Sequence, residues 1–243
     1  FKVDNSTFSA EYGRSSGAIV NIATRSGANQ FHGEAFDFVR NHVFDARNFF
    51  NPAPIAQNPF KRNQFGAALG GPIWKDHTFF FFSYEGLRQR QGITINTTVL
   101  SAADRAAATM AGNPTVLKRR PLIPPANSGA KFVGSAVAPV NIDQWTLDLS
   151  HNFSANDRLH GYYVFQRDLR QEPTLQGNNL PGFGDTRQSH RQVFTLNETH
   201  AFSPTVVNEA RLGFNRIHIT FVNNLAVNPA DFGIGNGVTT PIG

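Results

Sequence analysis

Apolar and polar residues alternate along much of the chain with a period of two, which is the pattern of β-strands with one apolar and one polar face. Helical periodicity is limited to Ser101–Ala111, where Ser101 is the predicted N-cap and Asp104 occupies the third helical position. The predicted strands are Ala18–Thr24, Phe31–Arg40, Phe65–Ile73, Thr78–Arg90, Gln144–Phe153, Leu159–Arg167, Gln192–Phe202 and Val207–Ile219.

The connections between these strands alternate between short and long. Short turns are predicted at Lys75–His77, Ser154–Arg158 and Ser203–Thr205, whereas long polar, Pro-containing segments occupy 41–61, 91–142 and 168–191. A transmembrane β-barrel has this organisation, with short periplasmic turns and long extracellular loops. A half-solvated soluble sheet predicts the same side-chain alternation but gives no reason for the alternation of connections.

The predicted strands also have a suitable length, because a tilted strand needs about 9 to 11 residues to cross a bilayer. We expect the apolar face, with residues such as Leu212, to contact lipid and the polar face to line the lumen. Three residues of the polar face are candidates for contact with a plug or a solute: Asp148, Glu209 and Arg211.

Four consecutive phenylalanines follow the first short turn. We expect Phe80 and Phe82 to face lipid, in an aromatic girdle at the periplasmic interface. Phe79 and Phe81 then face inward, which requires an interior that is filled by something other than water. Beyond Ser83 the inward face becomes polar.

Composition excludes several kinds of function. None of the 243 residues is cysteine, so a disulfide, a thiolate nucleophile and a Cys-based metal site are excluded. The net charge of +5 does not indicate nucleic-acid binding, because the basic cluster Lys118–Arg120 runs into a proline and is typical of a solvated loop. The sequence contains no run of 18 apolar residues, so it predicts no transmembrane helix. The chain starts without Met or an apolar leader, so we expect a piece of a longer protein.

Catalytic signatures are weak in this sequence. Gly13–Gly17 has the form Gly-x-Ser-Ser-Gly but lacks the strand–turn–helix context of a nucleophile elbow. The eight histidines form no His-Glu-x-x-His motif, and we expect no catalytic residue, metal or cofactor. Around the second short turn, His160 is expected to oppose either His151 or Asn152, depending on the register.

A resemblance to a known family covers roughly residues 8–92. It rests on "FSAEYGRSSGAIVNIATRSGANQFHGEAFDFVRN", "DARNFF" and "NQFGAALGGPIWKDHTFFFFSYEGLRQRQG". These segments resemble the TonB-dependent outer-membrane receptors and, more narrowly, the Oar-like group, whose plug ends in an "EYGRSSGGVVNVVTKSGTN"-type segment and whose barrel opens with "FHGSLFEFLRN". Ala18 stands where that pattern often has a second Gly. Residues 93–243 resemble the family only in their general pattern of barrel hairpins.

The resemblance implies an all-β antiparallel transmembrane β-barrel of 22 strands whose lumen is plugged, with about seven of the strands in this chain. Residues 1–28 correspond to the C-terminal part of the plug domain and 29–243 to the N-terminal part of the barrel. The residues implied to shape the plug–barrel contact are Tyr12, Gly13, Arg14, Gly17 and Arg25. We expect Arg14 or Arg25 to pair with an inward carboxylate such as Glu34 or Glu85.

The function that the resemblance implies is import of a scarce solute, such as a siderophore, glycan or peptide, across the outer membrane of a Gram-negative-type bacterium. The expected partners are outer-membrane lipid, the solute and TonB, which would act on an N-terminal segment that this chain does not contain. Loop candidates for touching the solute are Asn178, Asn179 and Phe183. Two alternatives stay open: a non-transport barrel with a role in adhesion or secretion, and a soluble β-rich carbohydrate-binding module.

Overall fold

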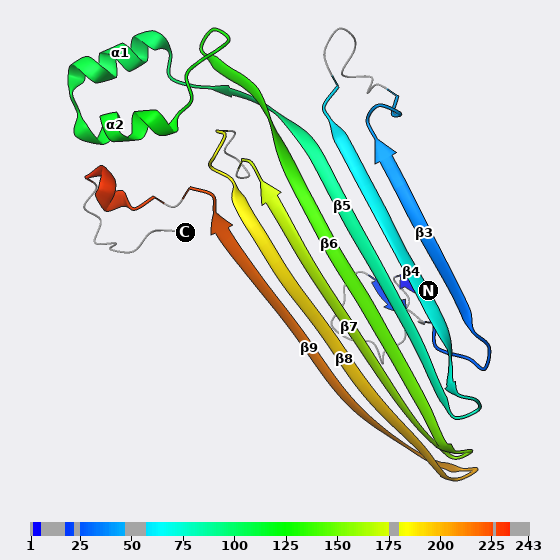
Figure 1. The fold of residues 1–243 in the computed structure, drawn as a ribbon. Helices are drawn as coiled ribbons and strands as arrows, with labels where there is room; N and C mark the ends of the chain where they lie inside the picture. The colour runs from blue at the N-terminus through cyan, green and yellow to red at the C-terminus, as the bar shows by residue number, and fades with distance from the viewer. Residues whose placement is uncertain are drawn as a thin grey trace.

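A computed structural model of the chain describes residues 2–5, 18–21, 25–46, 57–174, 180–225 and 227–233. Within these residues, seven strands form one antiparallel sheet in which each strand pairs with its neighbours in the sequence (Figure 1). The strands are β3 (His32–Asn41), β4 (Phe60–Trp74), β5 (Thr78–Thr98), β6 (Lys131–Ser154), β7 (Asp157–Glu172), β8 (Asp185–Ser203) and β9 (Val206–Asn223). The predicted all-β, antiparallel architecture with seven wall strands is confirmed.

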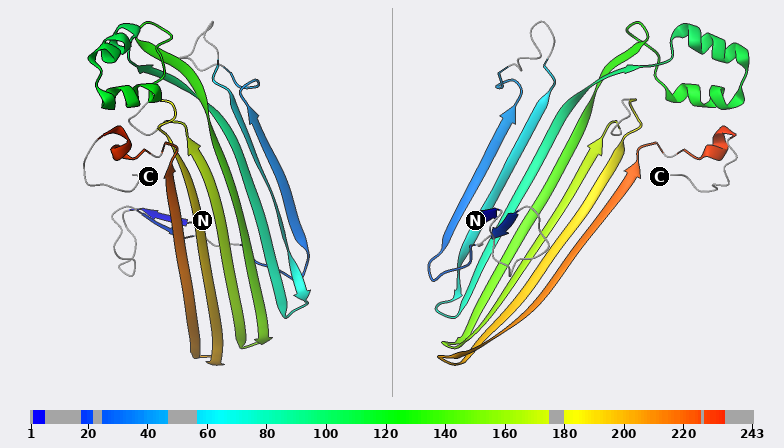
Figure 2. Two further views of the ribbon diagram at one scale, coloured as in Figure 1. Left: turned by 60° about the vertical axis from the view of Figure 1, so that its left-hand side comes forward. Right: turned by 180° about the vertical axis from the view of Figure 1, so that it is seen from behind.

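Two short strands form a second sheet. β1 (Lys2–Asn5) pairs in antiparallel orientation with β2 (Ala18–Asn21), which is the described part of the predicted strand Ala18–Thr24. Figure 2 shows the large sheet twisted and curved along its length, with the small sheet lying to one side of it. Twist of this kind is expected because each long strand carries its own right-handed twist.

The short turns lie together at one end of the large sheet (Figure 1). They occupy residues 75–77, 155–156 and 204–205, and the long connections lie at the opposite end. In the first turn, Asp76 adopts a φ of 63°, a left-handed conformation that Asp tolerates better than most residues. The predicted separation of short turns from long loops is therefore confirmed.

The strands extend further toward the long loops than the alternation predicts. β5 continues to Thr98 instead of ending at Arg90, and β6 starts at Lys131, within the predicted loop 91–142. The added residues are mainly polar or small, and they pair as Gly92↔Val137 through Thr98↔Lys131. Ile95 and Ala138 are buried in this extension. Gly92, Gly134 and Pro139 interrupt its apolar pattern, so the alternation did not indicate strands there.

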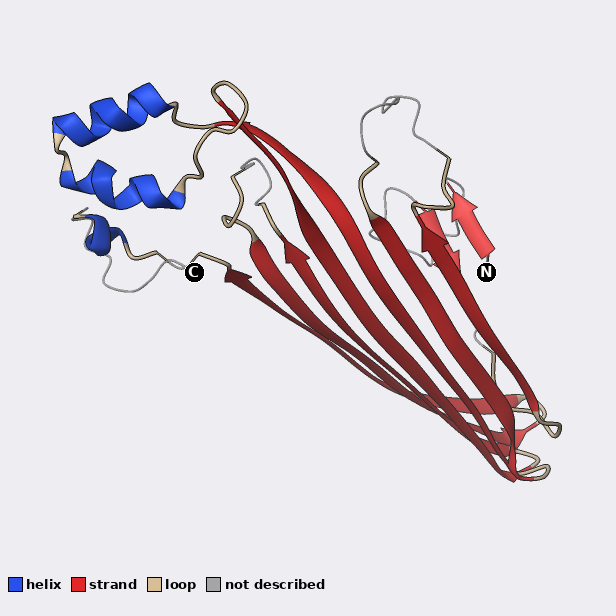
Figure 3. Ribbon diagram, turned by 45° about the horizontal axis from the view of Figure 1, so that its top comes forward, coloured by secondary structure: helices blue, strands red, loops and turns tan. Residues whose placement is uncertain are grey.

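Helix α1 (Ala102–Ala111) occupies the β5–β6 connection, where the sequence predicts a helix (Figure 3). The backbone N–H of Asp104 donates to the Ser101 hydroxyl, and the backbone N–H of Ser101 donates to the Asp104 carboxylate. This reciprocal capping box confirms the predicted start of the helix.

Three further helical segments were not predicted: α2 (Pro114–Arg119), η1 (Arg120–Leu122) and η2 (Pro229–Phe232). α2 begins at an Asn113 cap followed by Pro, but at six residues it is too short to show helical periodicity. Neither α-helix in the described residues has the length and hydropathy needed to cross a membrane.

The register divides the side chains of the large sheet between two faces. Phe80 and Phe82 share a face with their partners Leu149 and Leu147, as expected, whereas Phe79 and Phe81 share the opposite face with Ser150 and Asp148. We call the face that carries Asp148 the inner face and the other the outer face. The buried polar side chains of the described residues all belong to the inner face: Thr146, Asp148, Ser150, Asp168, Asp185 and Ser189.

Candidate site on the inner face

The segment that precedes β3 is fixed to the large sheet by polar contacts near the short-turn end. The side-chain amide of Asn29 donates to Asp76 Oδ1 at 2.7 Å, and the backbone N–H of Asp76 donates back to Asn29 Oδ1 at 2.8 Å. Arg25 Nη1 donates to Glu34 Oε1 at 3.2 Å, and both side chains are more than half exposed. The sequence suggested Arg25 and Glu34 as members of such a pair.

Close backbone packing places this segment on the inner face. A Cβ atom at Gly27 would lie within 3 Å of Phe79 Cβ and would clash with the backbone of Phe80. Only Gly permits this approach, because any other residue would push the segment off the wall. The segment before β3 therefore covers the inward side chain Phe79, which we expected to pack against something other than water.

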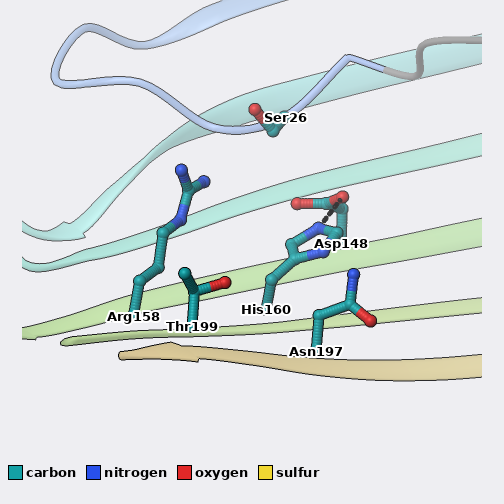
Figure 4. Close-up of a pocket in the computed structure, with 6 residues that line it drawn as sticks. All are labelled: Ser26, Asp148, Arg158, His160, Asn197 and Thr199. Carbon is teal, nitrogen blue, oxygen red and sulfur yellow. Dashed lines mark hydrogen bonds and ion pairs between the residues drawn. The ribbon is translucent and has the colours of Figure 1, made fainter. Parts of the chain in front are cut away.

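A polar hollow lies beside this segment. It has a volume of about 290 Å³ and is lined by Ser26, Asp148, Arg158, His160, Asn197 and Thr199 (Figure 4). Ser26 comes from the segment before β3, and the other five residues come from β6, β7 and β8. In the close-up, the side chains of Arg158 and His160 project from the wall toward the side on which Ser26 lies.

Asp148 is the most buried member of the hollow, with 1% of its surface exposed. Its Oδ2 lies 2.7 Å from Nε2 of His160, a short charge-assisted contact when the imidazole is protonated. Its Oδ1 is buried and has no hydrogen-bond partner among the described residues. A buried acceptor without a donor is costly, so the geometry leaves one acceptor available to a further group.

The other two polar-face candidates form a pair of their own. Arg211 Nη2 lies 2.5 Å from Glu209 Oε1, two positions away on the same strand. Arg211 is the cross-strand partner of Asn197, which lines the hollow, so it belongs to the same face. The structure thus places Asp148, Glu209 and Arg211 on one wall, but Asp148 pairs with His160 and not with either of them.

Further carboxylates continue the inner face toward the long loops. Ser189 donates to Asp168 across the β7–β8 pair, and Arg170 lies 3.6 Å from the same carboxylate. Arg187 Nε donates to Asp185 Oδ1 at 2.9 Å. One of these contacts joins two strands, and the other two join residues that lie two positions apart on the same strand. Sequence spacing alone therefore did not identify them.

The loop candidate Phe183 lies in an apolar cavity of about 240 Å³ at the long-loop end. The cavity is lined by Arg119, Leu122, Ile123, Leu180, Phe183, Val227 and Phe232, from three connections that are far apart in the sequence. The guanidinium of Arg119 lies over the Phe232 ring at 5.6 Å, and Lys118 donates to the carbonyl of Asp231. Lys118 and Arg119 are exposed, as expected of a solvated cluster, and these two contacts also join two loops.

Several predicted contact residues fall outside the described part of the chain. They are Tyr12, Gly13, Arg14 and Gly17 among the plug–barrel candidates, and Asn178 and Asn179 among the loop candidates.

Both predicted registers around the second short turn were wrong. His160 pairs with Ser150, His151 pairs with Leu159 and Asn152 pairs with Arg158. His160 therefore points to the inner face and His151 to the outer face, where it contacts Phe153 edge to face at 4.4 Å. The actual turn contains only Ala155 and Asn156, which is shorter than the predicted Ser154–Arg158 and moves the register.

A group of three potential metal ligands lies on the outer face near the short turns. Nδ1 of His200 lies 3.4 Å from Oδ2 of Asp157, and Glu198 brings its carboxylate within 4.8 Å of both. The Phe202 ring packs against His200 at 4.5 Å. We interpret the group as an ion pair at the membrane interface, next to an aromatic girdle residue.

The curved antiparallel wall, with short turns at one end and a polar inner face, is that of an outer-membrane β-barrel. Residues 23–242 match the family "Outer membrane beta barrel domain", and the chain belongs to that family. It therefore resides in an outer membrane, as predicted.

A curated relative narrows the comparison. The chain is 37% identical over 82 residues to "TonB-dependent transporter Oar" of Myxococcus xanthus, a match that covers 30% of this chain and 7% of that protein. This similarity supports the resemblance to the Oar-like group. No solved structure matches the chain.

Proposed function

We propose that this chain is part of a TonB-dependent outer-membrane transporter, and that it contains the junction between the plug and the barrel wall. In this proposal residues 1–28 end the plug domain and residues 29–243 begin the barrel. The barrel family and the transporter named Oar support the general role. The match covers only 7% of that transporter, so the solute and the energy source are part of the proposal.

The observation that carries the proposal is the attachment of residues 25–29 to the inner face. The chain enters the wall from the side of the lumen, held by Asn29 on Asp76 and by the close approach at Gly27. A domain that fills the lumen must be joined to the wall from this side. The polar hollow around Asp148 then offers a hydrogen-bond acceptor to the plug or to a solute that passes it.

The proposed mechanism uses no catalysis. Loops at the far end capture the solute, and the apolar cavity that contains Phe183 is a candidate contact. TonB then pulls on a segment of the plug that lies outside these residues, and the path opens. Binding of the solute favours the conformation that TonB engages, as a ligand shifts any equilibrium toward the state it binds more tightly.

The test is binding of TonB to the intact protein in nanodiscs. Immobilised protein is exposed to the purified periplasmic domain of TonB from the same bacterium. In the absence of solute, we expect saturable binding that is lost when the segment upstream of the plug is deleted and is unchanged by Phe183→Ala in the loop cavity.

Absence of TonB binding to a protein that is folded in the membrane would contradict the proposal. It would favour a barrel with a role in adhesion or secretion.

A further inference from the structure

An arginine recurs at one position in the strands that follow the short turns. Arg88, Arg167 and Arg216 each stand eleven residues after the last residue of the preceding turn, which is His77, Asn156 or Thr205. The register places all three arginines on the outer face. Arg88 lies an even number of residues from Phe82 on β5. Arg167 and Arg216 likewise lie an even number of residues from the outer-face positions of β7 and β9.

The outer-face residues just before each arginine are apolar or aromatic. They are Phe80, Phe82 and Tyr84 on β5, Tyr163 and Phe165 on β7, and Ala210, Leu212 and Phe214 on β9. Eleven residues of strand span about 36 Å, which at a tilt of about 40° corresponds to roughly 28 Å along the membrane normal. An apolar band of a barrel is about 25 Å tall, so the arginines stand at the head groups of the outer leaflet.

The three arginines differ in their partners. Arg88 donates to Asp143 at 2.6 Å, and the hydroxyl of Tyr84 donates to the same carboxylate at 2.7 Å, so this charge is neutralised by protein. Asp143 is also the cross-strand neighbour of Arg167. Arg216 stands on the edge strand β9 and makes no hydrogen bond or ion pair within the described residues.

A shallow hollow surrounds Arg216 on the outer face. It has a volume of about 260 Å³ and is lined by Phe165, His190, Gln192, Arg216 and His218. The imidazoles of His190 and His218 are stacked, with centroids 6.5 Å apart and planes at 13°, and Phe165 stacks on His190 at 6.2 Å. The lining residues include hydrogen-bond donors and a cation but no carboxylate.

We propose that this outer-face hollow binds the anionic phosphate head group of an outer-leaflet lipid. A guanidinium matches phosphate oxygens with two parallel hydrogen bonds, and the imidazoles and the amide of Gln192 supply further donors. The site opens toward lipid, and the apolar outer face that includes Phe214 continues below it as a surface for acyl chains. A lipid fits both parts of this surface, whereas free phosphate uses only the upper part.

The experiment is native mass spectrometry of the intact protein, titrated in detergent with phosphatidylglycerol, phosphatidylcholine or inorganic phosphate. We expect phosphatidylglycerol to bind in preference to the other two. Combining Arg216→Gln with His218→Gln should weaken this binding about tenfold, because charge-assisted hydrogen bonds are lost. Arg211→Gln, an inner-face change on the same strand, is the matched control and should leave lipid binding unchanged.

Two further variants keep the test decisive if the double variant folds poorly. Arg216→Lys retains the positive charge but lacks the planar guanidinium that donates two parallel hydrogen bonds, so this variant should bind phosphatidylglycerol with intermediate strength. Gln192→Glu adds a negative charge to the hollow and should abolish binding. Unchanged phosphatidylglycerol binding in Gln192→Glu or in the double variant would overturn the proposal, as would equal binding of phosphatidylcholine. Equally strong binding of inorganic phosphate would show an anion site without lipid specificity, and would overturn the assignment to lipid.

Discussion

Substitutions at two adjacent residues, one charged and one apolar, test which face of the sheet contacts lipid. Leu212 lies on the outer face, is 62% exposed and pairs with Leu196, whereas Arg211 lies on the inner face and pairs with Asn197. Leu212 stands seven residues after Thr205, roughly 18 Å along the membrane normal from the turn. Half of the 28 Å span estimated for the apolar band is about 14 Å, so Leu212 lies within about 4 Å of the bilayer midplane.

The two substitutions should therefore differ strongly in their effect on the free energy of unfolding. Leu212→Arg places a charge near the midplane on the lipid side and should cost about 2 to 4 kcal/mol. Arg211→Leu puts no charge into lipid. It removes the contact with Glu209 in a pair whose side chains are 68% and 42% exposed, and such pairs contribute only about 0 to 1 kcal/mol.

The assay is folding of the intact protein into lipid vesicles, followed by denaturant titration of each variant. Leu212→Met serves as a control for the loss of leucine without a charge. If Leu212→Arg is the milder change, the assignment of faces is refuted. Nitroxide labels then separate two reasons: a register slip makes position 211 the lipid-accessible one, whereas a soluble fold makes neither position accessible to lipid.

Four further outcomes are expected. The 243-residue chain alone should aggregate or stay molten in detergent, because β3 and β9 are open edges; a cooperative monomeric melting transition in plain buffer would argue for a soluble module. Asp148→Asn should destabilise the protein by about 1 to 3 kcal/mol in denaturant titration, since it alters a buried charged contact, and Glu209→Gln should cost less; equal costs would contradict the account of the hollow. Gly27→Ala should lower the folding yield in vesicles, whereas Gly213→Ala, which has open space around it, should not. Hydrogen bonds from the capping serine lower the pKa of Asp104. The contribution of the cap to the local stability of α1 should therefore be complete above the ordinary Asp pKa and be lost as the pH falls through the lowered pKa. Hydrogen exchange of α1 that does not change across this pH range would refute the cap.

The sequence predicted the lower part of the wall because the bilayer imposes a pattern there. The opposed faces of Leu212 and Arg211, the split of Phe79 to Phe82 and the capping box at Ser101 all follow from local rules of alternation and capping. Above the membrane no such constraint acts on the side chains. The extensions of β5 and β6 therefore could not be distinguished from loop.

The candidate site was only partly predictable. Asp148 was identified as an inward carboxylate, but its partner His160 depends on the register, and that depends on a two-residue turn whose length the sequence did not give. The apolar cavity around Phe183 joins segments that lie far apart in the chain, so no local pattern could indicate it.

Labelling in intact cells tests the orientation of the wall most directly. The 243 residues contain no cysteine, so single cysteines can be introduced at Ala107, in helix α1, and at Asn156, in the short β6–β7 turn. The account predicts that a membrane-impermeant maleimide labels position 107 in intact cells and labels position 156 only after the outer membrane is permeabilised. Labelling of position 156 in intact cells, with or without position 107, would contradict it.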